Sequence, residues 1–248
     1  MNDPLREAVH GSFRARAFAA HIHWYDLGME MCFKLLVVSC IGGLLACNSA
    51  HQMSSPDTVP AGEYRLGVGA AVSQDPNVQG DLEDGASEVG GHLLLWIRHG
   101  VTDKTEVALM SFGLLSGAKV GVKHQVLRSR STTGFALSMG SEVAAQVAPE
   151  LGDYTRDVKR VDLWLPVHLG YRTDPSLALY LSPRYARRLL WAGDSDLISH
   201  NVAGAVFGVQ LGTRVQTHLE FSAFRNLTDT GPDGPSDNEF GAAAGFSF

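Results

Sequence analysis

The chain ends on the stretch FGAAAGFSF, Phe240–Phe248, in which phenylalanine or alanine stands at every second position. Alternate side chains of a β-strand point to opposite faces, so one face of this stretch carries Phe240, Ala242, Ala244, Phe246 and Phe248. Chain ends are usually polar and frayed, and an aromatic face of this kind gains nothing from contact with water. The ending therefore predicts a last strand whose apolar face lies against a partner surface or an apolar solvent.

The same alternation continues through most of the chain after Gly62. From Val161 to Tyr171, for example, every odd-numbered residue is apolar. A two-residue period is typical of strands with one face in an apolar medium. We expect ten strands, at about residues 63–73, 87–99, 105–112, 118–126, 133–147, 158–172, 176–188, 198–211, 215–225 and 238–248. Most reach the roughly 9–11 residues that a tilted strand needs to cross a bilayer.

The connections between these strands point to a particular architecture. The even-numbered connections are all short, and most odd-numbered ones are long. Short turns at one end and long loops at the other are typical of an antiparallel up-and-down transmembrane β-barrel. We expect an all-β barrel of about ten strands over residues 62–248, with eight or twelve strands as alternatives. The alternative fold is a periplasmic lipoprotein β-sandwich or a lipocalin-like binding protein.

The apolar face of the last strand resembles the C-terminal signal of Gram-negative outer-membrane proteins, which ends on Phe with an aromatic residue two positions earlier. The turn region Trp96–Val107 is similar to strand–turn–strand units of the same broad superfamily. This resemblance implies a location in the bacterial outer membrane. It also implies contact with the barrel-assembly machinery, with membrane lipid and with lipopolysaccharide.

The N-terminal region resembles a lipoprotein export signal. Lys34 precedes an apolar run, Leu35–Leu45, which is too short for a membrane-spanning helix. The run ends in Leu-Leu-Ala-Cys at 44–47, which is similar to a bacterial lipobox and implies lipidation of Cys47. We expect an upstream extension over residues 1–30, a signal peptide over 31–46 and a polar tether over 47–61. A plain secretory signal cut near Ala50 is the alternative.

The strand face opposite the lipid is rich in charge. The residues expected to line the lumen are Arg65, Arg98, Glu106, Lys119, Lys123, Glu142, Arg160, Asp162, His168, Arg184, Arg188, His218 and Glu220. Buried charges persist by pairing, and a barrel of about eight strands is just filled by its own side chains. The pattern therefore indicates an ion-paired interior or, because basic residues outnumber acidic ones, a narrow passage for small anionic solutes.

Sequence features that carry chemistry are scarce. His218 and Ser222 lie on one predicted strand, as in a lipid-modifying acyl hydrolase, but four residues of strand, roughly 13 Å, separate them. We therefore expect no catalytic residues, no metal site and no cofactor, and keep the outer-membrane lipid-modifying enzyme as the alternative function. A net charge of −6 argues against a nucleic-acid partner.

A basic cluster, Arg184–Arg188, falls near the long-loop end of its strand. Phosphate groups of lipopolysaccharide lie at this level of an outer membrane. The sequence therefore suggests that Arg187 and Arg188 contact them.

Closure of the barrel predicts a heat-dependent gel mobility. Residues 47–248, expressed with an export signal, should enter the outer-membrane fraction and migrate differently before and after boiling, because a closed barrel resists detergent. A soluble protein without this shift would contradict the membrane barrel.

Overall fold

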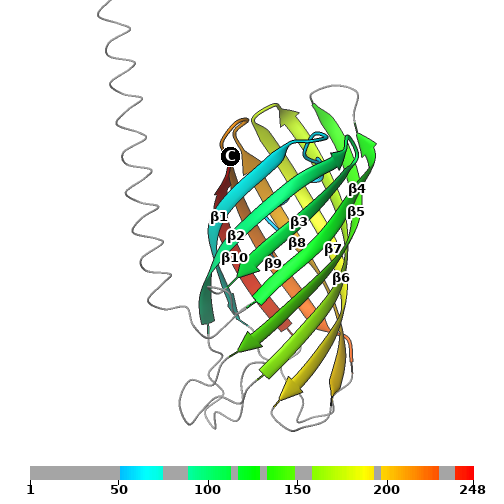
Figure 1. Cartoon of the computed structure of the whole chain (residues 1–248), viewed down its shortest axis with the longest axis vertical. Coiled ribbons are helices and arrows are strands. Elements are labelled where there is room, and N and C mark those ends of the chain that lie inside the picture. The colour runs from blue at the N-terminus through cyan, green and yellow to red at the C-terminus, as the bar shows by residue number, and fades with distance from the viewer. Residues whose placement is uncertain are drawn as a thin grey trace, which may run out of the picture.

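The computed structural model describes residues 51–74, 89–112, 117–128, 133–148, 158–192, 197–228 and 238–248. These residues form ten antiparallel strands (Figure 1). The strands are β1 Tyr64–Gln74, β2 Val89–Thr102, β3 Thr105–Phe112, β4 Gly117–Arg128, β5 Gly134–Ala148, β6 Val158–Asp174, β7 Leu177–Ala192, β8 Ile198–Leu211, β9 Gln216–Asn226 and β10 Asn238–Ser247. The predicted number of strands is confirmed.

Each strand pairs with its sequence neighbours, and β1 pairs with β10 to close the ring. The closing register runs from Gly67 opposite Ser247 to Gln74 opposite Phe240. One more pair of hydrogen bonds follows at the edge, from Leu66 N to Phe248 O at 3.0 Å and from Phe248 N to Leu66 O at 2.9 Å. The backbone is therefore paired up to the last residue of the chain.

The seam between β1 and β10 depends on glycine because an indole ring lies over it. Trp96 of β2 packs across Gly67 and Gly245, where an added Cβ atom would lie 2.1 Å and 2.6 Å from ring carbons. These two positions accept no side chain without moving Trp96. The seam is thus sealed from inside by an aromatic ring.

Side chains alternate around the whole ring. Large apolar residues face outward, and charged and polar residues face inward. Leu165, Phe221 and Phe248 are 57%, 59% and 63% exposed, whereas Arg188 and His218 are fully buried. A sandwich or a lipocalin-like fold hides its apolar face inside, so this distribution excludes the periplasmic alternative. The outer face is suited to lipid.

The short turns lie at the end of the barrel that holds the C-terminus (Figure 1). Asp103 and Lys104 connect β2 to β3, and Pro175 and Ser176 connect β6 to β7. Exposed aromatic residues gather near this end, where Phe135 and Tyr171 meet with ring centroids 6.1 Å apart. In an outer-membrane barrel this is the periplasmic end.

The outward-facing side chains predict that a charged substitution lowers the free energy of unfolding by an amount that depends on its depth in the membrane. Leu165→Arg, near the middle of β6, should lower the free energy of unfolding in lipid vesicles by about 2–4 kcal/mol, while an arginine near the interface costs about 0–1 kcal/mol. Val101→Arg at the end of β2 is the matched control, since Val101 is also apolar and 52% exposed. Urea titrations in vesicles measure both. Equal losses for the two variants would contradict the assigned membrane depth.

Candidate functional site

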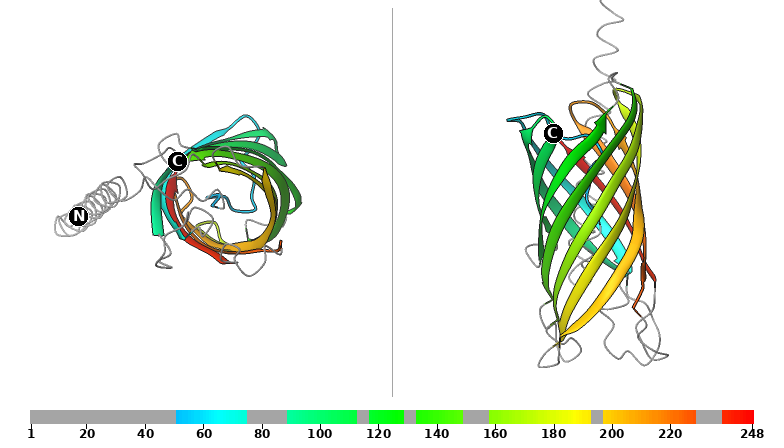
Figure 2. Two further views of the ribbon diagram at one scale, coloured as in Figure 1. Left: turned by 90° about the horizontal axis from the view of Figure 1, so that it is seen from below. Right: turned by 90° about the vertical axis from the view of Figure 1, so that its right-hand side faces the viewer.

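The interior of the barrel holds the residues that precede β1. Residues 51–60, here called the inner segment, run inside the ring of strands (left view of Figure 2). His51, Met53, Ser54 and Ser55 are all at most 3% exposed. The segment forms no helix or strand. The sequence suggested a polar tether here, and the structure places this part of it within the lumen.

Lys123 of β4 makes the densest set of contacts with the inner segment. Its Nζ donates to Ser54 Oγ at 2.8 Å, to Ser55 O at 2.7 Å and to Asp57 O at 2.9 Å. The same ammonium lies 2.9 Å from a carboxylate oxygen of Glu106, on the neighbouring strand β3. One wall cation thus binds three residues of the inner segment.

Two further cations donate to carbonyl groups of the segment. Lys119 Nζ donates to His51 O, and Arg98 donates to Met53 O. Met53 has a φ of 49°, a left-handed conformation uncommon outside glycine. This local turn directs its carbonyl to the Arg98 guanidinium. Backbone carbonyl groups that no strand partner satisfies are therefore satisfied by the wall.

Gln52 is held by charged groups on opposite sides of the lumen. Its side-chain amide donates to Glu142 and accepts from Arg184, and its backbone N donates to Glu220 at 3.0 Å. Tyr180 donates to the other oxygen of Glu220 at 2.8 Å. These four wall residues come from β5, β7 and β9. The inner segment thereby connects strands that do not pair with one another.

Glycine residues of the wall make room for the segment. A Cβ atom at Gly170 would lie 2.4 Å from Pro56 Cγ, and one at Gly100 would lie 2.0 Å from Pro60 O. Gly241 is a third wall glycine in contact with the segment. The lumen is therefore shaped around an extended peptide, and the contact is more than charge pairing.

A second ion network lies toward the long-loop end. Asp162 accepts from Arg188 Nε at 3.0 Å and from Arg160 Nε at 2.8 Å, and Arg188 also pairs with Glu239. All four side chains are at most 4% exposed. This network links β6, β7 and β10.

The predicted lumen residues all lie on the inner face. Arg65 is half-buried at the short-turn end, and the following are buried: Arg98, Glu106, Lys119, Lys123, Glu142, Arg160, Asp162, His168, Arg184, Arg188, His218 and Glu220. Six of these seven lysines and arginines, all except Arg65, contact an acidic side chain or the inner segment within the described chain. The apolar residues of the last strand face outward, and Cys47 lies outside the described residues.

The basic cluster near the long-loop end is divided by the strand alternation. Arg188 is fully buried and ion-paired, so its suggested contact with lipopolysaccharide is wrong. Arg187 faces outward and donates to Asn201 Oδ1 at 3.0 Å and to Ser199 Oγ at 2.6 Å. Only Arg187 of this pair is available to a lipid headgroup.

The histidine and serine of β9 do not form a catalytic pair. His218 Nε2 lies 3.0 Å from Ser247 Oγ, and Ser222 Oγ has no hydrogen-bond partner in the described part of the chain. Both residues are buried on the inner face. They therefore lack both the mutual geometry and the lipid access that acyl transfer to a membrane lipid requires.

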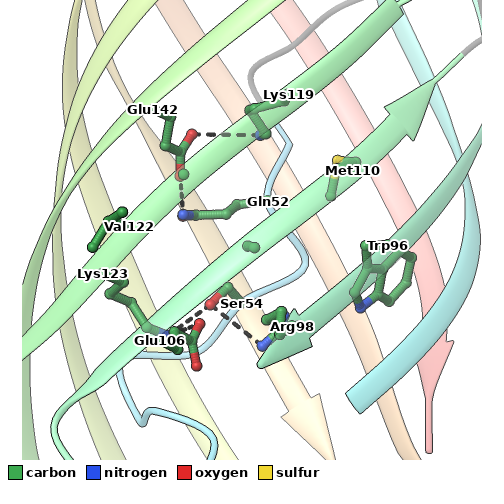
Figure 3. A pocket seen from close by; sticks show the side chains of 12 residues that line it. Gln52, Ser54, Trp96, Arg98, Glu106, Met110, Lys119, Val122, Lys123 and Glu142 are labelled. Atoms are coloured by element: carbon green, nitrogen blue, oxygen red, sulfur yellow. Dashed lines mark hydrogen bonds and ion pairs between the residues drawn. The ribbon is translucent and has the colours of Figure 1, made fainter. Parts of the chain in front are cut away.

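Little open space remains around the inner segment. The cavity between it and β2–β5 is ≈ 20 Å³, lined by Gln52, Arg98 and Lys119 among others (Figure 3). About one water molecule fits such a volume. A larger cavity of ≈ 260 Å³ opens at the short-turn end. Its arginine Arg128 was missed by the sequence reasoning because a β-bulge after Gln125 changes the face of β4.

Several solved structures show a distant similarity to this chain. Neisserial surface protein A is 10% identical, with a TM-score of 0.41 over 74% of this chain and 95% of that one. The outer membrane protease OmpT from Escherichia coli is 8% identical, with a TM-score of 0.41 over 75% and 96%. Ail, the attachment invasion locus protein of Yersinia pestis, in complex with a heparin analogue, is 13% identical, with a TM-score of 0.31 over 76% and 99%. No family model and no curated protein matches the sequence.

Such low sequence identities and TM-scores do not indicate the role of this chain. Its own geometry decides the architecture, since a closed ring of strands has an apolar exterior and a charged interior. The chain has the architecture of a membrane-spanning β-barrel.

Two kinds of feature are absent from the described residues. No group of three or more metal-ligating side chains is present among them. Within the same residues, no helix is long and apolar enough to cross a membrane.

The ion pair of Lys123 with Glu106 and the contacts of Lys123 with the inner segment, here called the central network, predict a large loss of stability when one partner is removed. Lys123→Met should lower the free energy of unfolding by about 3–5 kcal/mol, because Glu106 is left buried without its ammonium. The double variant Lys123→Met with Glu106→Gln should recover part of this loss. Lys104→Met, at an exposed turn position, is the matched control and should change stability by less than about 0.5 kcal/mol. Equal effects of the two lysine variants would refute the network.

Proposed function

We propose that the protein is an outer-membrane barrel whose own N-terminal segment holds its lumen shut. In this state it acts as a structural barrel that displays its long loops, and small anions pass only when the inner segment withdraws. The observation that carries the proposal is the bonding of wall cations to main-chain carbonyls of residues 51–57.

The contacts of the inner segment favour a plug that can be exchanged for water. Most of them are hydrogen bonds to wall side chains, and the bridge between Ala61 and Gly100 lies just beyond the segment. Water can replace each carbonyl acceptor in turn. By contrast, a strand of the ring cannot leave without exposing unpaired backbone to lipid.

The charge balance of the wall supports preference for anions. The wall groups that contact the inner segment comprise five cations, Arg98, Lys119, Lys123, Arg172 and Arg184, and three carboxylates, Glu106, Glu142 and Glu220. Withdrawal of the segment leaves positive charge in excess along the lumen. A lumen of this sign concentrates anions.

Export and anchoring belong to the same proposal. We propose that residues 31–46 direct export, that Cys47 carries the lipid and that the barrel-assembly machinery recognises the Phe-ended last strand. His218 and Ser222 give no support to a lipid-modifying activity. Both lie inside the barrel, and they form no hydrogen bond with each other in the described chain.

A single wall substitution tests the plug. Gly170→Val should push Pro56 off the wall, since even a Cβ atom would lie 2.4 Å from it. In planar bilayers the wild type should stay closed, and this variant should show open-channel events with an anion-selective reversal potential in a KCl gradient.

Gly91→Val is the matched control. A Cβ atom there lies no closer than 3.7 Å to its neighbours and does not approach the inner segment. It should stay closed. Heat-dependent gel mobility must show that both variants form barrels. If folded Gly170→Val and a variant lacking residues 51–60 both remain silent, the lumen is filled by the wall alone and the plug proposal fails.

A further inference from the structure

A cavity of ≈ 260 Å³ lies at the short-turn end, between the inner segment and the surrounding strands. It is here called the vestibule. Its volume equals that of on the order of eight water molecules, so a small organic or inorganic ligand fits. It opens toward the periplasmic side.

Three arginines from three separate strands line the vestibule: Arg65 of β1, Arg128 of β4 and Arg172 of β6. Arg128 reaches it because of the bulge between Gln125 and Leu127, after which Arg128 lies opposite Ala136 of β5. Ala136 faces inward and is 7% exposed. The bulge thus places the Arg128 guanidinium on the inner face. Strict alternation would have placed it toward the lipid.

The acceptors around these arginines are few. Arg65 donates to the amide oxygen of Gln216 at 2.7 Å, which is a neutral partner. Arg128 has no hydrogen bond or ion pair with any residue that the structure describes. Arg172 donates to Asp57 Oδ2 from Nε at 3.2 Å and from Nη2 at 2.7 Å.

Asp57 is the only acidic residue among those that line the vestibule in the described chain. Three positive charges therefore face one carboxylate, which belongs to the inner segment and not to the wall. Its side chain is 24% exposed and that of Arg172 is 19% exposed. This pair is accessible to a competing anion, unlike the buried pairs deeper in the lumen.

We propose that the vestibule is a binding site for a small polyanion with phosphate or carboxylate groups. One oxyanion group of the ligand replaces the Asp57 carboxylate on Arg172, and a second group lies between Arg65 and Arg128. Guanidinium groups bind both classes of oxyanion through paired N–H donors. The site does not require the passage proposed above, because it is present with the inner segment in place.

Calorimetric titration of the folded, detergent-solubilised chain tests the site. Inorganic pyrophosphate and citrate are the probes for the phosphate and carboxylate classes, and chloride at equal ionic strength is the reference. Arg128→Gln should weaken binding of the preferred probe about tenfold, the loss expected for one charge-assisted hydrogen-bond donor. Asp57→Asn should strengthen it by a similar factor, because the internal competitor is gone.

Lys104→Gln is the matched control, since it removes one positive charge at the same end of the barrel outside the vestibule. It should leave the affinity unchanged. Arg128 has no described partner, so its variant should fold normally, as heat-dependent mobility can verify.

Two outcomes would overturn the site. The first is binding no tighter than that of chloride for both probes. The second is equal weakening by Arg128→Gln and Lys104→Gln, which would mean diffuse attraction to the barrel mouth. A barrel that conducts without binding either probe would refute the vestibule site alone, while probe binding by a barrel that never opens would refute the plug alone.

Discussion

Closure of the backbone hydrogen-bond ring is the constraint on which the rest of this structure depends. In lipid no water can satisfy an unpaired N–H or C=O group, so every strand needs two neighbours. The first and last strands meet this need by pairing with each other, and the pairing continues to Phe248 at the chain end. The terminal aromatic face then follows, because the strand that completes the ring must present apolar side chains to lipid.

Closing the ring creates a second problem, which is an interior that must be filled. A ten-stranded wall encloses more charged side chains than it can pair by itself. Near the long-loop end, the wall supplies its own carboxylates, and Asp162 pairs with two arginines. Around the inner segment, peptide carbonyls add to the carboxylates of the wall. Lys119 and Lys123 are bonded in this way, by a segment that carries one carboxylate at Asp57.

Much of the wall could be predicted from the sequence because lipid and lumen impose opposite demands on adjacent residues. The apolar residues at odd positions from Val161 to Tyr171 thus revealed β6 and its orientation. The same rule should have separated Arg187 from Arg188. It fails at Arg128, where one inserted residue shifts the alternation. The inner segment has no hydrophobic period, since its backbone bonds to side chains from many strands. The wall glycines that it contacts, Gly100 and Gly170, gave no sign of this in the sequence.

The position of the inner segment has a consequence for assembly. It is continuous with β1, which lies at the seam, and its partners are spread over strands from β2 to β9. Those partners come together only as the sheet curls, when charged side chains lose their water. The segment is then a ligand supplied in cis at high effective concentration. The chain carries its own counter-groups into the closing ring, so that burial of the lysines and arginines and completion of the cylinder become one cooperative event.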